Sequence, residues 1–141
     1  MINPYNQTKD SCNLCNEFAR ILGADILSST KDLCVVTFTR DIKAEILCRP
    51  THSPLALNAL FSFESMDCKG KTLNLGETVI LQEEINCFIS VLRENNIIVT
   101  ALHNHWLFEN PRLMYIHFES IDEPLDFARK VAEALRVLRS K

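Results

Sequence analysis

Hydrophobic residues follow two different periods along the chain, which predicts a mixture of helices and strands. Three segments repeat apolar residues every three or four positions, as in a helix with one buried face; they cover 10–22, 82–94 and 122–138. Between them lie β-branched or alternating runs typical of strands; they cover 33–38, 42–48, 58–66, 72–81, 97–102 and 113–118. Short turns join neighbouring strands. This order predicts an α+β fold with a mainly antiparallel sheet and about three helices packed on one face.

The alternation is clearest in 42–48, where every second residue is apolar. Arg40 and Asp41 can form a turn before this run, so 33–38 and 42–48 are expected to form one antiparallel hairpin with one wet face. Gly23 is expected to end the first helix, because glycine accepts the left-handed backbone found there.

Length and charge restrict the classes of protein that remain. The 141 residues fit one domain: 1–9 are polar and predict a disordered tail, and 10–141 a single domain. A formal net charge of −3 with scattered basic residues gives no reason to expect a nucleic-acid partner. No apolar run reaches the roughly 18 residues of a membrane span, and no apolar segment follows Met1. We therefore expect no membrane partner and a cytoplasmic location.

The six cysteines are expected to be free thiols, because a disulfide framework is typical of small secreted domains. Cys12 and Cys15 have the spacing of a zinc or redox motif, but both fall on the apolar stripe of the first helix, and no second close pair follows. They are expected to be buried and to pack as small hydrophobic residues, as are Cys48 and Cys87.

Candidate chemistry is concentrated near one strand end, where three of the four histidines fall within fifteen residues. In extended backbone His103 and His105 point to one face, with their Cα atoms roughly 6–7 Å apart. Two imidazoles so placed can ligate one metal ion, and zinc accepts imidazole together with carboxylate. Glu109 could then supply an oxygen from the following loop. The letters His-Asn-His do not indicate an HNH nuclease, since the context of that motif is missing.

The position of His117 depends on strand register. A symmetric hairpin would pair His103 with Met114 and Thr100 with His117, which puts His117 on the opposite face from His103 and His105. A one-residue bulge would reverse this. A three-histidine site therefore needs a bulge, or strands that are not direct neighbours.

Other interpretations of the segment stay open. The histidines could line a metal-free polar pocket or be structural, with the Asn104 side chain closing a turn. Arg112 can bind an anionic ligand or pair with Glu109. Trp106 can line a pocket, join a subunit interface or lie in the core.

From Thr37 to Leu138 the chain resembles the LppY/LpqO family, a bacterial domain family of unknown function. The matching motifs are Phe38-Thr39-Arg40-Asp41, Gly76-Glu77-Thr78-Val79-Ile80-Leu81, Glu84-Ile85-Asn86, Leu92-Arg93-Glu94-Asn95-Asn96-Ile97, Thr100-Ala101-Leu102-His103-Asn104-His105, Glu109-Asn110-Pro111-Arg112 and Tyr115-Ile116-His117-Phe118. The resemblance implies one shared motif made of His103, Asn104, His105, Glu109, Arg112 and His117. Family members tend to have Asp where this chain has Glu77. Some are exported lipoproteins, but export is not carried over, and the family brings no established reaction.

Three hypotheses follow. In the first, the pocket holds a divalent metal, with zinc preferred, and binds or acts on a small anionic molecule. His103, His105 and either Glu109 or His117 would hold the ion, which lowers the pKa of its water. Arg112 would position the anion, and Arg40, Asn104 and Trp106 are further candidates for ligand binding. In the second, the same residues bind a small-molecule ligand without metal or catalysis, with Trp106 or Phe108 stacking on it. In the third, the loop serves oligomerisation, as in a homodimer.

Overall fold

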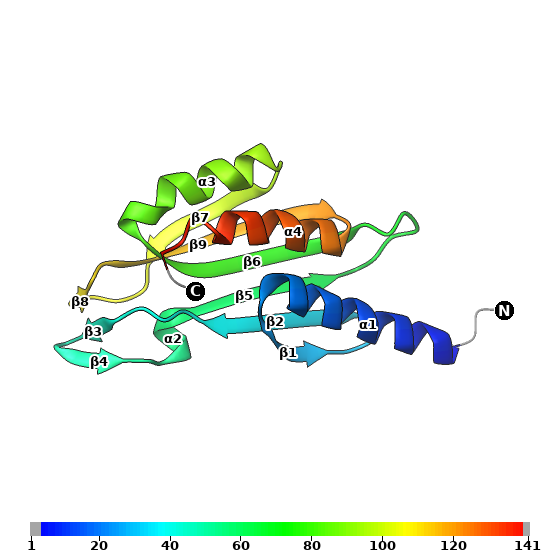
Figure 1. Cartoon of the computed structure of the whole chain (residues 1–141), viewed down its shortest axis with the longest axis horizontal. Helices are drawn as coiled ribbons and strands as arrows, with labels where there is room; N and C mark the ends of the chain where they lie inside the picture. Colours follow the sequence, from blue (N-terminus) through cyan, green and yellow to red (C-terminus); the bar gives the residue numbers. More distant parts are fainter. Residues whose placement is uncertain (1–3, 140–141) are drawn as a thin grey trace.

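The computed structural model describes residues 4–139, with side chains described from Cys12 onwards. Helical segments are α1 (Pro4–Leu22), α2 (Pro54–Leu57), the 3-10 turn η1 (Gln82–Glu84), α3 (Ile85–Glu94) and α4 (Pro124–Leu135). The strands are β1 (Asp25–Ser29), β2 (Leu33–Thr39), β3 (Ala44–Ile46), β4 (Arg49–Thr51), β5 (Asn58–Glu64), β6 (Thr72–Leu81), β7 (Ile98–Asn104), β8 (Glu109–Asn110) and β9 (Leu113–Asp122). Figure 1 shows their arrangement.

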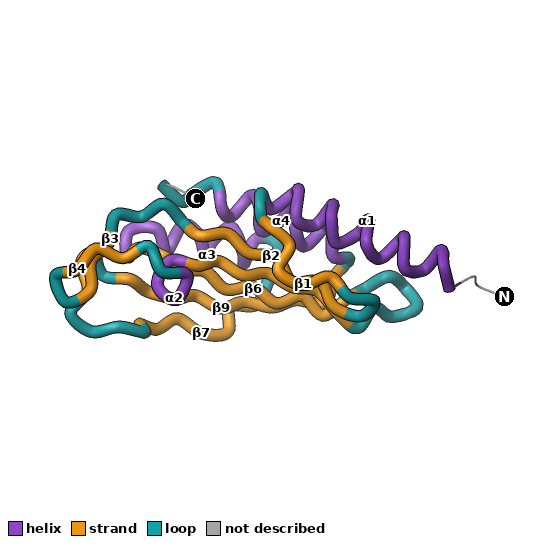
Figure 2. Tube along the Cα trace, turned by 90° about the horizontal axis from the view of Figure 1, so that it is seen from below, coloured by secondary structure: helices purple, strands orange, loops and turns teal. Residues whose placement is uncertain are grey.

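Six strands form the main sheet in the order β1-β2-β5-β6-β9-β7, and every neighbouring pair is antiparallel. A small three-stranded sheet, β4-β3-β8, lies at one end of the molecule (Figure 1). The long helices α1, α3 and α4 cover one face of the main sheet (Figure 2). The predicted α+β fold with a mainly antiparallel sheet is confirmed.

The main core lies between these helices and the sheet. Alternate residues of the strands point to the helices, as the period of two requires; for example, Phe61 of β5 and Phe118 of β9 are buried there. Phe18 of α1 and Phe127 of α4 meet them from the helix side. A Cβ at Gly76 would lie 2.2 Å from the ring of Phe118. Glycine at this position therefore lets the ring approach the backbone of β6 closely.

A second, smaller core lies on the opposite face of the sheet. Val79, Leu113 and Tyr115 point away from the long helices and pack with Ala56 and Leu57 of α2. The rest of this face has no helix over it. We call it the open face.

The predicted hairpin of 33–38 with 42–48 is wrong. β2 pairs with β1 and β5, and β3 instead turns back onto β4. The two residues of that turn, Leu47 and Cys48, have φ values of 52° and 62°, the positive values that a tight hairpin turn needs.

The prediction of free thiols is also wrong in part. Cys15 of α1 and Cys34 of β2 form a disulfide, because the apolar stripe that buries Cys15 packs it directly against the strand. Cys12, Cys48 and Cys87 are exposed free thiols rather than buried ones.

Helix α1 begins at Pro4, six residues before the predicted start at Asp10. Residues 1–3 of the predicted tail lie outside the described residues, and the single-domain boundary at residue 10 stays a prediction. Among the described residues, no helix combines the length and the apolar character needed to cross a membrane.

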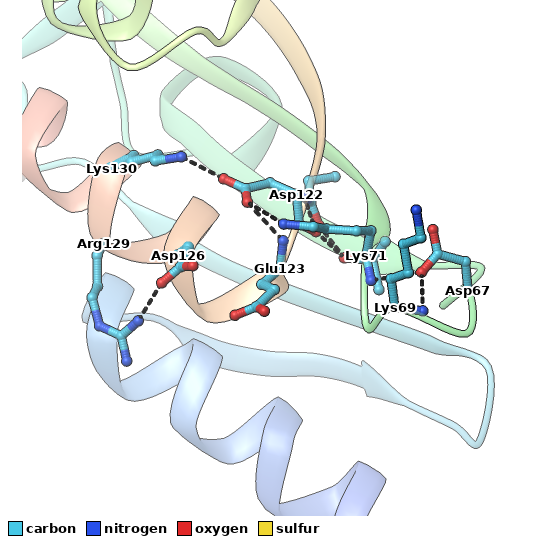
Figure 3. Close-up of polar contacts among 10 residues, drawn as sticks. Asp67, Lys69, Lys71, Asp122, Glu123, Asp126, Arg129 and Lys130 are labelled. Atoms are coloured by element: carbon cyan, nitrogen blue, oxygen red, sulfur yellow. Dashed lines mark hydrogen bonds and ion pairs between the residues drawn. The ribbon is translucent and has the colours of Figure 1, made fainter.

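Charged side chains fasten the junction between β9 and α4 (Figure 3). Asp122 accepts a hydrogen bond from the Lys130 ammonium at 2.6 Å and another from the backbone N–H of Glu123 at 2.8 Å. Lys71 lies 3.8 Å from the same carboxylate. Burial alone would raise the pKa of Asp122, but these partners lower it below its usual value.

A buried ion pair joins the segment after β2 to η1. Both terminal nitrogens of Arg40 donate to the carboxylate of Glu84 at 2.9 Å, and both side chains are almost fully buried. Glu84 also accepts from the backbone N–H groups of Leu81 and Arg139. Burial opposes its charge, yet these donors keep the pKa of Glu84 below its usual value.

Candidate metal centre

Three histidines gather on the open face, next to the small core. His103 lies on β7, His105 directly follows that strand, and His117 lies on the neighbouring strand β9. One ring nitrogen of each lies within 4.8 Å of the others. The ring centroids of His103 and His105 are 4.8 Å apart, and those of His103 and His117 are 4.9 Å apart.

A bulge in β7 brings His117 to the same face as the other two. Val99 lies opposite Phe118, but the next pair is Ala101 opposite His117, so Thr100 is an extra residue. Directly opposed residues of an antiparallel pair share a face. Val99 can therefore face the core while Ala101, His103 and His105 face outward. The sequence left open on which face His117 lies, and the bulge puts it on the same face as His103 and His105.

The contacts of His117 and His103 favour the tautomer in which Nδ1 carries the proton and Nε2 is free. Nδ1 of His117 lies 3.0 Å from a carboxylate oxygen of Glu77, and Nδ1 of His103 lies 3.3 Å from the backbone oxygen of Asn104. If Nδ1 carries the proton and donates it to these acceptors, Nε2 is left with its lone pair. Nε2 of His117 is buried and has no hydrogen-bond partner among the described residues. A carboxylate behind a histidine that presents its other nitrogen is a common arrangement at metal sites.

Glu77 is the site residue that sequence reasoning missed. It lies on β6 directly opposite His117, and the cross-strand row continues to Leu60 on β5. The only signal in the sequence was its place in a matching motif. Pairing of β6 with β9 joins residues forty positions apart, and local patterns do not encode that register.

Electrostatics keep His105 suited to bind a metal. Burial, followed by the neighbouring rings of His103 and His117, lowers the pKa of His105, while Glu77 opposes this shift. A lowered pKa favours the neutral imidazole, which is the form that ligates metal ions. The ring of His105 also stacks on Tyr115 with centroids 4.0 Å apart and an interplanar angle of 9°, which restricts its orientation.

Tyr115 connects the histidines to the small core. Its hydroxyl donates to the backbone oxygen of Ala56 at 2.7 Å and accepts from the indole N–H of Trp106 at 2.9 Å. Burial raises the pKa of Tyr115 above its usual value, so the hydroxyl keeps its proton. Trp106 is thereby fixed as the wall of a hollow of about 520 Å³ that also reaches His105 and Glu77.

Other predicted site residues lie elsewhere or bond to one another. Glu109 belongs to the small sheet and pairs with Arg112 at 2.7 Å, the ion pair that the sequence allowed as an alternative, and it is not part of the histidine group. The Asn104 side chain donates to the backbone oxygen of Trp106 and closes the turn. Arg40, which the sequence suggested as a ligand-binding residue, lies away from the histidine group, with its guanidinium buried against Glu84.

The donor set fits a divalent metal ion. Bonds of 2.0–2.1 Å at a tetrahedral zinc separate two nitrogens by about 3.3 Å. The three nitrogens lie within 4.8 Å of one another, so modest adjustments of the side chains, above all of exposed His103, would bring them to that distance. Three histidine ligands leave one position open, as at catalytic zinc sites.

Comparison with known protein families matches residues 16–137 to the family described as Domain of Unknown Function (DUF1259). The chain belongs to the DUF1259 family. The match includes the three histidines and Glu77. No curated protein and no solved structure matches the chain. Membership of DUF1259 supplies no reaction.

Proposed function

We propose that this DUF1259 protein binds a divalent metal ion, with zinc preferred, through His103, His105 and His117. The observation that supports this most strongly is the buried, unpartnered Nε2 of His117, whose other nitrogen faces Glu77. A buried ring nitrogen without a partner loses free energy unless something binds it. A metal ion at the centre of the three rings would satisfy it.

The proposed ion leaves a coordination position for water or for a ligand atom. When bound, a divalent metal lowers the pKa of a coordinated water and attracts anionic groups. Among the described residues that line the hollows beside the site there is no lysine or arginine. We therefore propose that the metal, rather than Arg112, holds the anionic group of a small-molecule ligand.

Two finer points belong to this proposal. The narrower LppY/LpqO assignment remains a resemblance based on the sequence motifs. The cytoplasmic expectation is not carried forward, because the Cys15–Cys34 disulfide favours an oxidising compartment.

Metal content tests the proposal. The protein is purified without chelators or a histidine tag, loaded with zinc, dialysed and analysed by mass spectrometry of the elements. We expect about one zinc per chain, loss of zinc in His103→Ala and His117→Ala, and full retention in His52→Ala. His52 is the matched control, because it is exposed and lies outside the histidine group. Absence of stoichiometric metal, or equal loss in all three variants, would contradict the proposal.

The metal-free alternative is a pocket that binds ligand by side-chain contacts alone. The hollow beside Trp106 favours it, since it exists without any ion. Ligand-induced increases in melting temperature that are unchanged by a chelator would support this alternative over the metal site.

A further inference from the structure

The hollow beside the histidine group has walls that are mostly apolar. Its apolar lining consists of Pro54 and Leu55 of α2, Leu60 of β5 and the rings of Trp106 and Tyr115. Leu55 is 75% exposed, although it is a large apolar residue. The volume of about 520 Å³ lies within the range of small-molecule sites.

The polar groups of these walls already have partners inside the protein. The Trp106 N–H donates to Tyr115, and the Tyr115 hydroxyl donates to Ala56. The Thr78 hydroxyl donates to the backbone oxygen of Val79, and the amide of Asn58 donates to Thr37. The walls therefore have few donors left for a ligand. A polar ligand group placed there would lose its hydrogen bonds to water and find none in the protein to replace them. An apolar group has no such bonds to lose, so the walls favour apolar groups.

Two polar lining residues of the hollow belong to the histidine site. His105 is one of the proposed metal ligands, and Glu77 contacts another of them, His117. Glu77 carries negative charge when ionised, and the described lining residues of this hollow include no lysine or arginine. An anionic group is therefore disfavoured everywhere in the hollow except on the metal itself.

We infer that the ligand is a small amphipathic molecule with two parts. An oxygen-rich head, such as a carboxylate or a hydroxamate, coordinates the metal, and an uncharged aromatic or branched apolar group fills the hollow between α2 and Trp106. This inference rests on the proposed metal site and goes further, because it names the chemistry of the part that the metal does not touch.

Two probes that share a metal-binding head but differ in their apolar group measure the contribution of each part to binding. Acetohydroxamate and benzohydroxamate coordinate zinc alike, but only the second carries a phenyl ring. Both are titrated by calorimetry into zinc-loaded protein whose metal content has been measured. We expect benzohydroxamate to bind at least tenfold more tightly than acetohydroxamate, because the ring leaves water for an apolar wall.

Two leucine variants locate the ring. Leu55→Glu places a charge at the mouth of the hollow, and we expect it to weaken benzohydroxamate at least fivefold while acetohydroxamate changes less than twofold. Leu75→Glu is the matched control: Leu75 is an exposed leucine on the open face that lines a separate hollow of about 380 Å³. It should leave both affinities unchanged.

The outcomes are distinct. Zinc binding with equal affinities for the two probes would overturn the inference and leave the metal site standing. A loss in Leu75→Glu instead of Leu55→Glu would place the ring in the other hollow and would also overturn it. If zinc does not bind, the proposed function fails, and the inference fails with it.

Discussion

The contact between His117 and Glu77 distinguishes this group of histidines from a chance cluster on a sheet surface. Three neighbouring imidazoles alone would repel one another when protonated and would turn outward to water. A carboxylate 3.0 Å from Nδ1 holds the His117 ring in place, and a second acceptor lies beside Nδ1 of His103. Contacts of single residues thus orient two of the three rings within the group.

Substituting Glu77 tests the role of the carboxylate that contacts His117. In Glu77→Gln the side chain keeps its size but loses its charge, so the charge-assisted contact that orients the His117 ring through Nδ1 becomes weaker. We expect the zinc dissociation constant to rise about tenfold or more, measured by competition with a chromophoric chelator. Glu119→Gln is the control, since Glu119 follows His117 by two residues on the same face of β9. Equal effects of the two substitutions would show that Glu77 acts only through its negative charge near the site and not through its contact with His117.

The Arg40–Glu84 pair, by contrast, is structural. Removing Arg40 leaves a buried carboxylate without its main partner, and we expect Arg40→Met to lower the free energy of unfolding by about 3 kcal/mol or more. In Arg40→Met/Glu84→Gln the charge is gone, but the amide oxygen can still accept from Leu81. The double variant should therefore be more stable than Arg40→Met alone in urea denaturation. A double variant that is less stable would contradict this account.

At the level of elements, local patterns predicted the helices and most strands well. The predicted strand 72–81 coincides with β6, and the last helix begins at Pro124 within the predicted segment. These segments are long and periodic, so their burial is visible in the sequence. Spacing also placed His103 and His105 on one face, because that needs only the period of a strand.

Features that depend on partners distant in the sequence were not predictable. The bulge at Thr100 adds one residue to β7 without any glycine or other local signal. The contact of Glu77 with His117 and the burial of Arg40 by Glu84 arise only when separate elements pack. The hairpin prediction failed for a related reason: the alternation of Ile42 and Ala44 reflects burial in the small core rather than pairing with β2.

The disulfide links two elements, and its contribution can be measured directly. Cys15 and Cys34 are nineteen residues apart, and closing a loop of this size stabilises a fold by about 3 kcal/mol in the chain-entropy account. We expect reduction to lower the free energy of unfolding by about that amount in urea titrations with and without dithiothreitol. In Cys12→Ala, which removes an exposed free thiol, the oxidised protein should keep its full stability. Equal stability of the oxidised and reduced protein would contradict the prediction.

In the whole molecule, the long helices take one face of the sheet and leave the other for chemistry (Figure 2). The small core under α2 ends at Tyr115, and the histidine group begins beside it. This arrangement gives the site a rigid floor of three neighbouring strands, β6, β9 and β7. Its walls come from α2 and the segment after β7, which carries Trp106. A rigid floor with separate walls is suited to precise positioning of ligands.

The stability of the whole fold should depend on pH through carboxylates far from the histidines. The pKa values of Asp122 and Glu84 lie below their usual values, so the unfolded chain binds protons at these groups at a higher pH than the native protein does. Their contribution is present above the unfolded values near pH 4 and is lost as the pH falls through the native values. The pKa of His105 is also lowered, so we expect a small decrease in the free energy of unfolding as the pH falls through about 6.5. The two carboxylates should add a steeper decrease below about pH 5.

Substitutions at Asp122 can measure its share of the decrease in the free energy of unfolding at acid pH. Its main partner is Lys130 (Figure 3), so Asp122→Asn and Lys130→Met should each remove about 1 kcal/mol at pH 7 and flatten the acid limb of the stability profile. Because both substitutions remove the same interaction, their effects should not add in the double variant. Urea denaturation at pH 3.5, 5 and 7 measures all four proteins. Additive losses, or an acid limb as steep in Asp122→Asn as in the unmodified chain, would show that the acid sensitivity arises elsewhere.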